Sequence, residues 1–248
     1  MRLARIATPA GPRHAVADGA DWAVVEDVFA RPLVPTGERH PQDGARLLAP
    51  VEPRVVLGMA HNTGPADREL PPQAFMKSAR TVVGPGDAIR LDPRRGEVKV
   101  EGELAVVVRR QCRNLAPEEV PDAVLGWTVG NDVTAVDQVA LDEKMTQSKN
   151  GDGFTPLGPW VETELDPRDV AIEVRVGDEV AAAGSTSGLA RDVVELLVYL
   201  TAHLDLGPGD VVLTGAPGTG ATVVPGDRAA ITLAGIGTLT NPVVRAAL

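Results

Sequence analysis

The chain has 248 residues, 44% of them hydrophobic and 23% charged, enough for one large domain or one domain with a small appendage. Its net charge of −10 argues against nucleic acid as a partner, because the phosphate backbone would be repelled. A single cysteine excludes an internal disulfide. The N-terminus does not resemble a leader sequence, and no apolar run approaches about 20 residues. We therefore expect a cytoplasmic protein without a membrane partner.

The first 50 residues predict a small N-terminal domain and linker, followed by the main domain over residues 51–248. MRLARIA and DWAVVEDV are typical of short strands, whereas the proline-rich segment 31–50 is expected to be loop. The main domain opens near Val51 with a buried strand, VEPRVVLGMA.

Strand patterns then predominate along the main domain. GEVKVEGELAVVVRR is a clear strand, and VLGWTVGNDVTAV is another apolar run that leads into a polar turn. There, Thr134 with Asp137 resembles a capping pair that opens a short helix through about Met145. Further strand-like segments follow in residues 154–162, 170–184, 210–218, 227–237 and 238–244.

The best predicted helix lies in ARDVVELLVYLTAHLDLGPGD. Asp192 can cap it, with Glu195 at the third helical position, and Gly207 and Pro208 stop it. Its apolar residues recur at helical spacing: Val193, Leu196, Leu197, Leu200 and Leu204. With few helices and no regular βαβ rhythm, the fold class is α+β and mostly β, with a rolled or barrel-like sheet.

The first chemical signal is the pair Glu101 and Glu103. In a strand they face the same side, roughly 6 to 7 Å apart, while valines and leucines face the other. Two like charges this close are uncomfortable in a partly buried place unless a cation lies between them. Taken alone, the pair is more typical of the solvated face of an edge strand.

The second signal is Asn131-Asp132, where an apolar strand ends abruptly. By itself the pair suggests a turn or a helix cap. Together with Glu101 and Glu103, however, Asp132 completes a set of three carboxylates, which is what a hard divalent cation such as Mg²⁺ or Mn²⁺ prefers. The absence of nearby histidine or cysteine argues against zinc.

Three further segments contain candidate functional residues. Lys149 precedes a glycine-rich loop and could hold a substrate carboxylate or an enolate oxygen, or be an ordinary surface lysine. Thr214-Gly215 begins a loop that meets neither the Walker nor the dinucleotide fingerprint and is interpreted as a pocket rim. His61 precedes a flexible loop with Asp67 and Glu69, where it could activate a water or be a structural histidine.

These pieces, in this order, resemble the fumarylacetoacetate hydrolase family. The resemblance covers about residues 51–245 and rests on the segments Glu101-Gly102-Glu103-Leu104-Ala105, Gly126-Trp127 with Asn131-Asp132-Val133-Thr134-Ala135, Lys149 before Pro156-Leu157-Gly158-Pro159, and Thr214-Gly215-Ala216-Pro217. Many family members carry a His with a Glu three residues later near Gly58. Here His61 either replaces that pair, alone or with Glu69, or fills a tyrosine position.

The resemblance implies the family's mixed β-roll, usually paired as a homodimer. Glu101, Glu103 and Asp132 would bind Mg²⁺ or Mn²⁺, and Lys149 would contact a small dicarbonyl or 2-oxo acid. The remaining candidate site residues are Thr214, Gly215 and Asn131 for substrate binding and His61 and Glu69 for catalysis.

The predicted activity is metal-dependent hydrolysis of a C–C bond in an acylpyruvate or fumarylacetoacetate-like acid. The metal would stabilise the enolate, Lys149 would add positive charge, and His61 would deprotonate the attacking water. A decarboxylase or an isomerase or hydratase of 2-oxo acids on the same site needs no such water. A non-catalytic binding protein, or a serine hydrolase without its usual G-x-S-x-G signature, is less favoured.

Overall fold

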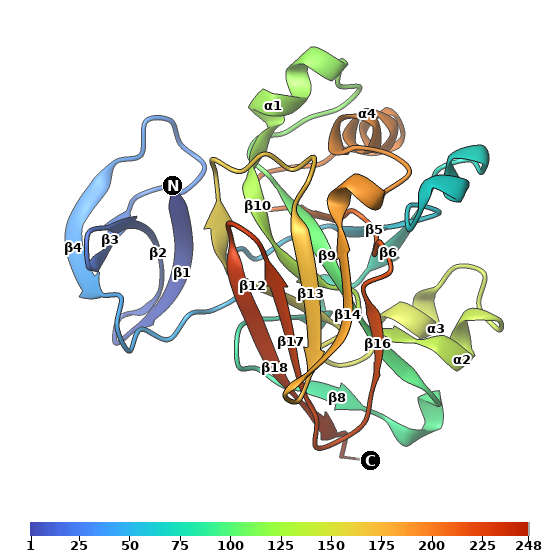
Figure 1. Cartoon of the computed structure of the whole chain (residues 1–248). Helices are drawn as coiled ribbons and strands as arrows, with labels where there is room; N and C mark the ends of the chain where they lie inside the picture. The colour runs from blue at the N-terminus through green and yellow to red at the C-terminus, as the bar shows by residue number, and fades with distance from the viewer. Residues whose placement is uncertain (248) are drawn as a thin grey trace.

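Two mixed β-sheets form the framework of the computed structural model, which describes residues 1–247 (Figure 1). The larger sheet has the order β4-β3-β2-β1-β12-β10-β9-β15-β5-β6, with β7, β11 and β16 attached beside it, and the smaller has the order β14-β13-β17-β18-β8. The predicted mostly-β class with a mixed, rolled sheet is confirmed, although within the described chain neither sheet closes into a barrel.

The strands of the first half are β1 (Arg2–Thr8), β2 (Gly11–Asp18), β3 (Asp21–Val25), β4 (Pro35–Pro41), β5 (Val56–Ala60), β6 (Gln73–Lys77), β7 (Val82–Val83), β8 (Ile89–Leu91) and β9 (Val98–Val108). Those of the second half are β10 (Val124–Asn131), β11 (Thr134–Ala135), β12 (Thr155–Glu162), β13 (Ala171–Val176), β14 (Glu179–Ser185), β15 (Val211–Leu213), β16 (Gly220–Val223), β17 (Arg228–Leu233) and β18 (Gly237–Arg245). The α-helices are α1 (Val120–Ala123), α2 (Val136–Val139), α3 (Thr146–Lys149) and α4 (Val193–His203). The 3₁₀ turns are η1 (Pro65–Glu69), η2 (Ala79–Thr81), η3 (Pro93–Arg95), η4 (Pro117–Glu119) and η5 (Thr186–Gly188).

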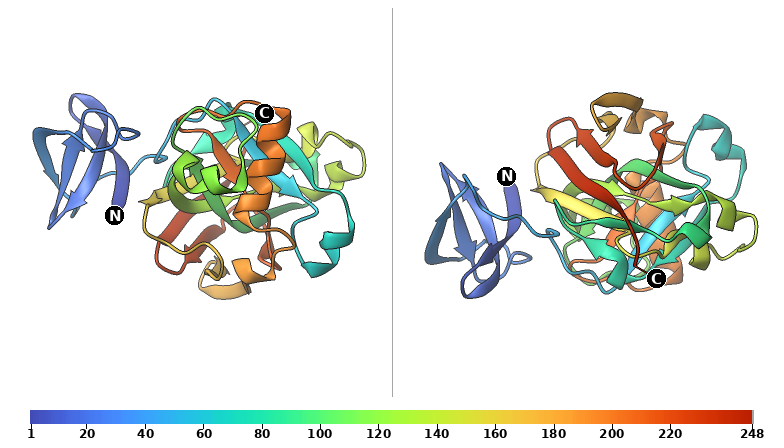
Figure 2. Two further views of the ribbon diagram at one scale, coloured as in Figure 1. Left: turned by 90° about the horizontal axis from the view of Figure 1, so that it is seen from above. Right: turned by 90° about the horizontal axis from the view of Figure 1, so that it is seen from below.

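Strands β1 to β4 form an antiparallel unit that lies to one side of the main body (Figures 1 and 2). The segment 31–50, predicted as loop, contains β4. That prediction is wrong because β4 is the outermost strand of the sheet, where prolines are tolerated. The unit joins the body through β1, whose residue Arg2 pairs with Glu162 of β12.

The main core lies between the long strand β9 and the smaller sheet. Alternation along β9 sends Val98, Val100, Leu104 and Val106 into one hydrophobic cluster with residues of β13, β17 and α4. At Gly102 the sheets approach so closely that a Cβ atom would lie 2.8 Å from the Cγ2 of Val174. On the opposite face of β9, Ala105 and Val107 are buried in a second hydrophobic cluster, whereas Lys99, Glu101 and Glu103 line the cavity described below.

Helix α4 forms where the sequence predicts it and lies across the body in the view from above (Figure 2). Asp192 and Glu195 make the predicted reciprocal cap, and the buried side includes Leu196, Leu197 and Leu200. The helix ends at His203, earlier than the predicted stop at Gly207, because Leu204 already adopts an extended backbone. No helix in residues 1–247 is long and apolar enough to cross a membrane.

The predicted helix from Thr134 to about Met145 is wrong. Thr134 belongs to strand β11, which pairs with β9, and two single-turn helices, α2 and α3, follow separately. Instead of capping a helix, the Thr134 hydroxyl donates to Glu101 Oε2 at 2.7 Å, and the Asp137 carboxylate accepts the backbone N–H of Glu97 at 3.0 Å. Contacts with β9 therefore outcompete the local capping signal.

Candidate active site

Glu101 and Glu103 lie where β9 changes its partners. The first half of the strand pairs with β11 and β16, and the second half with β10 and β15. The turn after β10 is fastened to this point, because Asn131 Oδ1 accepts the N–H of Glu101 at 3.1 Å and the N–H of Asp132 donates to the carbonyl of Glu101 at 2.9 Å. The fold thereby brings Asp132 beside the two glutamates.

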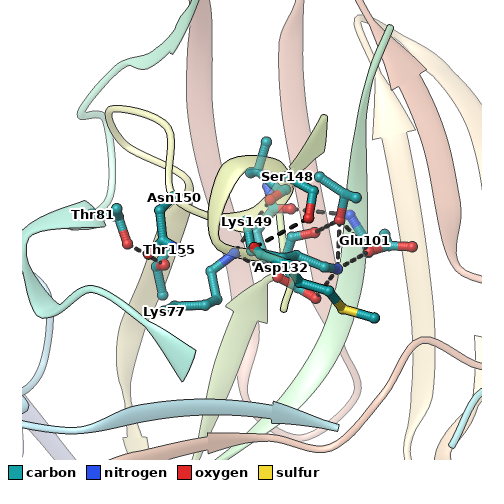
Figure 3. A network of polar contacts seen from close by, with 12 residues as sticks. Lys77, Thr81, Glu101, Asp132, Ser148, Lys149, Asn150 and Thr155 are labelled. Atoms are coloured by element: carbon teal, nitrogen blue, oxygen red, sulfur yellow. Dashed lines mark hydrogen bonds and ion pairs between the residues drawn. The ribbon is translucent and has the colours of Figure 1, made fainter. Parts of the chain in front are cut away.

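Asp132 is buried between two ammonium groups (Figure 3). Lys77 Nζ donates to its Oδ1 at 2.5 Å, and Lys149 Nζ donates to its Oδ2 at 2.5 Å. Burial alone would raise the pKa of Asp132, but the charges of the two lysines outweigh it, so the pKa lies below its ordinary value. Asp132 is therefore an ionised carboxylate at the centre of a buried charge cluster.

The two lysines differ in their surroundings. The side chain of Lys77 has no exposed surface, and burial lowers its pKa despite the opposing charge of Asp132. Lys149 also contacts Glu101 Oε2 at 3.1 Å and the Thr134 hydroxyl at 2.7 Å, and its ammonium lies 4.7 Å from the ring centre of Phe75. Burial opposes the charge of Lys149, but Asp132 and Glu101 raise its pKa above its ordinary value.

Glu103 is a buried carboxyl group that forms no ion pair within residues 1–247. Its Oε2 accepts the backbone N–H of Gly215 at 2.6 Å. Burial first, and then the charges of Asp132 and Glu101, raise its pKa well above the ordinary value. A cation placed beside Glu103 would relieve both effects.

A cavity of about 360 Å³ opens over this cluster. Its lining includes all three predicted metal ligands and Lys149; the other lining residues are Met59, Ala60, His61, Thr63, Asp67, Phe75, Lys99, Thr134, Val136, Val139, Met145 and Ala216. The volume suits a small organic acid.

His61 stands in the cavity wall in an unusual conformation. Its backbone φ is +56°, and its Nδ1 lies 3.2 Å from the carbonyl oxygen of Pro71. Because a carbonyl oxygen only accepts, Nδ1 is the donor in this contact, and in the neutral imidazole Nε2 is then the proton acceptor. Glu69 is exposed and lies outside the cavity lining. Asp67 is near enough for its charge to interact with His61, but its carboxylate is bonded to Thr63.

The three predicted substrate-binding residues contact other protein groups. Within the described chain none of them lines the cavity. Asn131 holds Glu101, the Thr214 hydroxyl donates to the carbonyl of Leu104 at 2.9 Å, and the Gly215 N–H is engaged by Glu103. Their contact with substrate stays a prediction. The structure adds that these three residues hydrogen-bond to residues of β9, including two of the cavity-lining glutamates.

Lys77 is the principal site residue that sequence analysis missed. A signal for it exists, because alternation along β6 places it on the same buried side as Phe75. Asn62 and Arg191 were also missed; they tie the His61 segment to the start of α4 through contacts between residues 129 positions apart, which no local pattern reveals.

The donor set fits a hard divalent ion in its chemistry. Three carboxylates line one cavity, and Glu103 is buried without a cationic partner. As they stand, no three acidic, histidine or cysteine side chains in residues 1–247 form a cluster that could hold a metal ion, and the two ammonium groups occupy both oxygens of Asp132. Glu101, Glu103 and Asp132 are therefore suitable ligands; Glu101 and Asp132 now pair with lysines, and Glu103 accepts a backbone N–H.

Comparison with known proteins gives matches over the whole chain. Residues 50–244 match the sequence profile described as fumarylacetoacetate (FAA) hydrolase, C-terminal, and residues 1–50 match one described as Rv2993c-like, N-terminal. Protein Rv2993c of Mycobacterium tuberculosis is 36% identical, with 99% of this chain and 98% of that protein covered. Oxaloacetate tautomerase YisK of Bacillus subtilis is 33% identical over 72% of this chain and 63% of that protein.

Solved structures share the fold at full length. The 5-carboxymethyl-2-hydroxymuconate delta-isomerase of Mycobacterium smegmatis is 37% identical with a TM-score of 0.93, covering 99% of this chain and all of the other. Maleylpyruvate hydrolase of Sphingobium sp. SYK-6, in complex with a manganese(II) ion and pyruvate, is 26% identical with a TM-score of 0.81 and complete coverage of both chains.

Proposed function

The chain belongs to the fumarylacetoacetate hydrolase family, and on that premise we propose that it is a divalent-metal-dependent isomerase that interconverts the keto and enol forms of a small 2-oxo acid. The observation that carries this proposal is that His61 lines the cavity with its Nδ1 3.2 Å from a backbone carbonyl, an arrangement that leaves Nε2 of the neutral ring as the acceptor. One acceptor in the wall of a cavity with cationic groups suits the transfer of one proton. The names of the isomerase at 37% identity and the tautomerase at 33% support the same class.

The floor of the cavity suits an enolate. A divalent ion held by Glu101, Glu103 and Asp132 would act as a Lewis acid on the 2-oxo group when bound. Manganese in a relative that shares the fold supports such an ion. Lys149 adds a positive charge at the same place, where it stabilises the oxygen that becomes negative.

His61 serves as the base in the proton transfer. In the keto-to-enol direction, Nε2 takes a proton from carbon 3, the electrons of that C–H bond form the C2–C3 double bond, and the π electrons of the 2-oxo group become a lone pair on its oxygen. That oxygen then takes one proton, either from the imidazolium itself or from water while the imidazolium releases its proton to water, so mass and charge are conserved.

Hydrolysis of a C–C bond is the second candidate. It needs an attacking water, and a histidine that deprotonates water is better served by a carboxylate that stabilises the imidazolium. Glu69 lies outside the cavity lining, whereas Asp67 lies close enough for its charge to interact with His61. The hydrolase at 26% identity supports this candidate less strongly than the closer relatives support isomerisation.

We expect the wild-type protein with Mn²⁺ to accelerate the keto–enol equilibration of oxaloacetate, followed by the ultraviolet absorbance of the enol. His61→Ala should lower kcat by roughly 10²- to 10⁴-fold, as loss of a general acid–base group does. His203→Ala is the matched control, because His203 is exposed on α4 and lies outside the cavity lining. Analysis of the products by NMR decides the class of reaction. Two acids would indicate hydrolysis, and loss of CO₂ would indicate decarboxylation. If hydrolysis or decarboxylation were faster than keto–enol equilibration, the proposal would be contradicted.

Lys99 leads to a second expectation, about substrate binding. It lines the cavity with 42% of its side chain exposed, and its nearest carboxylate, Glu97, is 3.7 Å away. A second carboxylate on the substrate would find this loosely paired ammonium at the cavity edge. Lys99→Gln should therefore raise KM for oxaloacetate about 3- to 10-fold, as expected for an exposed ion pair, without affecting a 2-oxo monocarboxylic acid. Lys144→Gln, at a position outside the cavity lining, should leave KM for both acids unchanged. Equal effects of Lys99→Gln on the two acids would refute a role of Lys99 in binding the second carboxylate.

A further inference from the structure

The segment 61–70 forms one wall of the cavity but has little hydrophobic anchorage. His61, Thr63 and Asp67 line the cavity, while η1 within the segment contains no buried residue. Its internal bonds are local, such as the N–H of Thr63 to the carboxylate of Asp67 at 2.7 Å. Because such a segment opens easily, its position must depend on polar contacts with the rest of the protein.

Arg191 supplies most of those contacts. Its Nη1 donates to the carbonyls of His61 at 2.9 Å and Asp67 at 3.3 Å, and its Nη2 donates to those of Arg68 at 3.4 Å and Leu70. Within residues 1–247 this guanidinium forms no ion pair, so its hydrogen bonds go to the carbonyls of this one segment. Because one side chain donates to four backbone carbonyls of the segment, it holds both ends of the segment together.

The backbone of Arg191 makes a second attachment through Asn62, which is fully buried. Arg191 N–H donates to Asn62 Oδ1 at 2.7 Å, and Asn62 Nδ2 donates to the carbonyls of Arg191 at 3.1 Å and Thr214 at 2.7 Å. Arg191 itself directly precedes Asp192, the cap of α4. The wall that contains His61 is thus fixed to the rigid start of α4.

The conformation of His61 needs this support. A φ of +56° is sparsely populated for a residue with a side chain and persists where surrounding contacts over-determine it. The contacts that define it here are Pro71 on the ring and Arg191 on the carbonyl.

We propose that Arg191 is a positioning residue that holds the His61 imidazole toward the cavity, with Nδ1 protonated and Nε2 available. This inference rests on the proposed function, in which Nε2 moves the proton. Arg191 itself does not line the cavity and touches no reacting atom.

The test is a double-mutant cycle of Arg191→Met with His61→Ala. Arg191→Met keeps the length of the side chain but removes its donors, and it should lower kcat about 10- to 100-fold with KM changed less than about 3-fold, since the group misplaced acts in the chemical step. In the His61→Ala background the same change should cause almost no further loss, because the residue that Arg191 positions is gone. Additive losses would overturn the proposal.

Two measurements separate a failure of the Arg191 proposal from a failure of the proposed function. The ¹⁵N resonances of His61 should show the Nδ1–H tautomer in the wild type and a mixture in Arg191→Met, and amide exchange over residues 61–71 should accelerate in the variant alone. If His61→Ala is fully active, the proposed function fails, yet the ¹⁵N and amide-exchange signals still decide the role of Arg191. Unchanged signals in Arg191→Met would overturn the positioning role of Arg191.

Arg191→Lys, which retains a donor, should recover part of the activity and of the ¹⁵N and amide-exchange signals that Arg191→Met loses. Arg68→Met is the matched control, since this exposed arginine makes only one contact from the segment to Ala190, beside its ion pair with Glu195.

Discussion

An Asp132→Asn variant is expected to lose divalent-metal binding, all metal-dependent turnover and about 3 to 5 kcal/mol of folding stability. The stability loss arises because Asp132 is the only carboxylate that pairs with Lys77 within the described chain, and Lys77 has no exposed side-chain surface. An asparagine is nearly the same size but cannot neutralise that ammonium. Calorimetric titration with Mn²⁺ and denaturant unfolding measure the two effects separately.

A double variant separates the site from the fold. Lys77→Met combined with Asp132→Asn removes both charges of this pair and should recover most of the lost stability, because no unpaired ammonium is then buried at position 77 and Lys149 keeps Glu101 as a partner. It should still give no heat with Mn²⁺. Metal binding that survives in the single variant would mean that the three-carboxylate assignment is wrong, and unchanged stability would mean that Lys77 has another partner.

The second large effect is expected for Gly215→Ala, which should reduce turnover about 100-fold and lower stability by about 3 kcal/mol or more. Gly215 has a φ of +109°, and a Cβ atom there would lie 2.1 Å from the backbone oxygen of Asn62. The loop must therefore shift, and its N–H then leaves the carboxylate of Glu103, which it contacts at 2.6 Å. Mn²⁺ affinity should fall together with activity.

Gly218→Ala provides the matched control three residues away. Gly218 also has a positive φ, +73°, but a Cβ atom there meets nothing within 4 Å. It should show only the conformational effect of about 1 to 2 kcal/mol, with Mn²⁺ binding and turnover like the wild type. Equal behaviour of the two alanine variants would show that the contact of Gly215 with Asn62, and through it the support of Glu103, is unimportant.

Local patterns predicted the parts of the structure whose stability is local. The alternation along β9 and the reciprocal cap of α4 by Asp192 and Glu195 are both present. The same kind of evidence failed at Thr134 and Asp137, because their side chains bond to Glu101 and Glu97 across the fold. It failed again at β4, a proline-containing strand that exists only because β3 offers it a partner.

The sequence by itself determined the family, the mostly-β class and the candidate set of three carboxylates with Lys149, because each rests on short segments of recognisable residue types that follow one another in a fixed order along the chain. Tertiary structure alone decided how the charges are shared: that Lys77 and Lys149 both hold Asp132, that Glu103 is held by a backbone N–H, and that Arg191 holds the wall bearing His61. These contacts join residues 17 to 130 positions apart. Electrostatic and hydrogen-bond energies depend on distance and burial in space, which spacing along the chain does not encode.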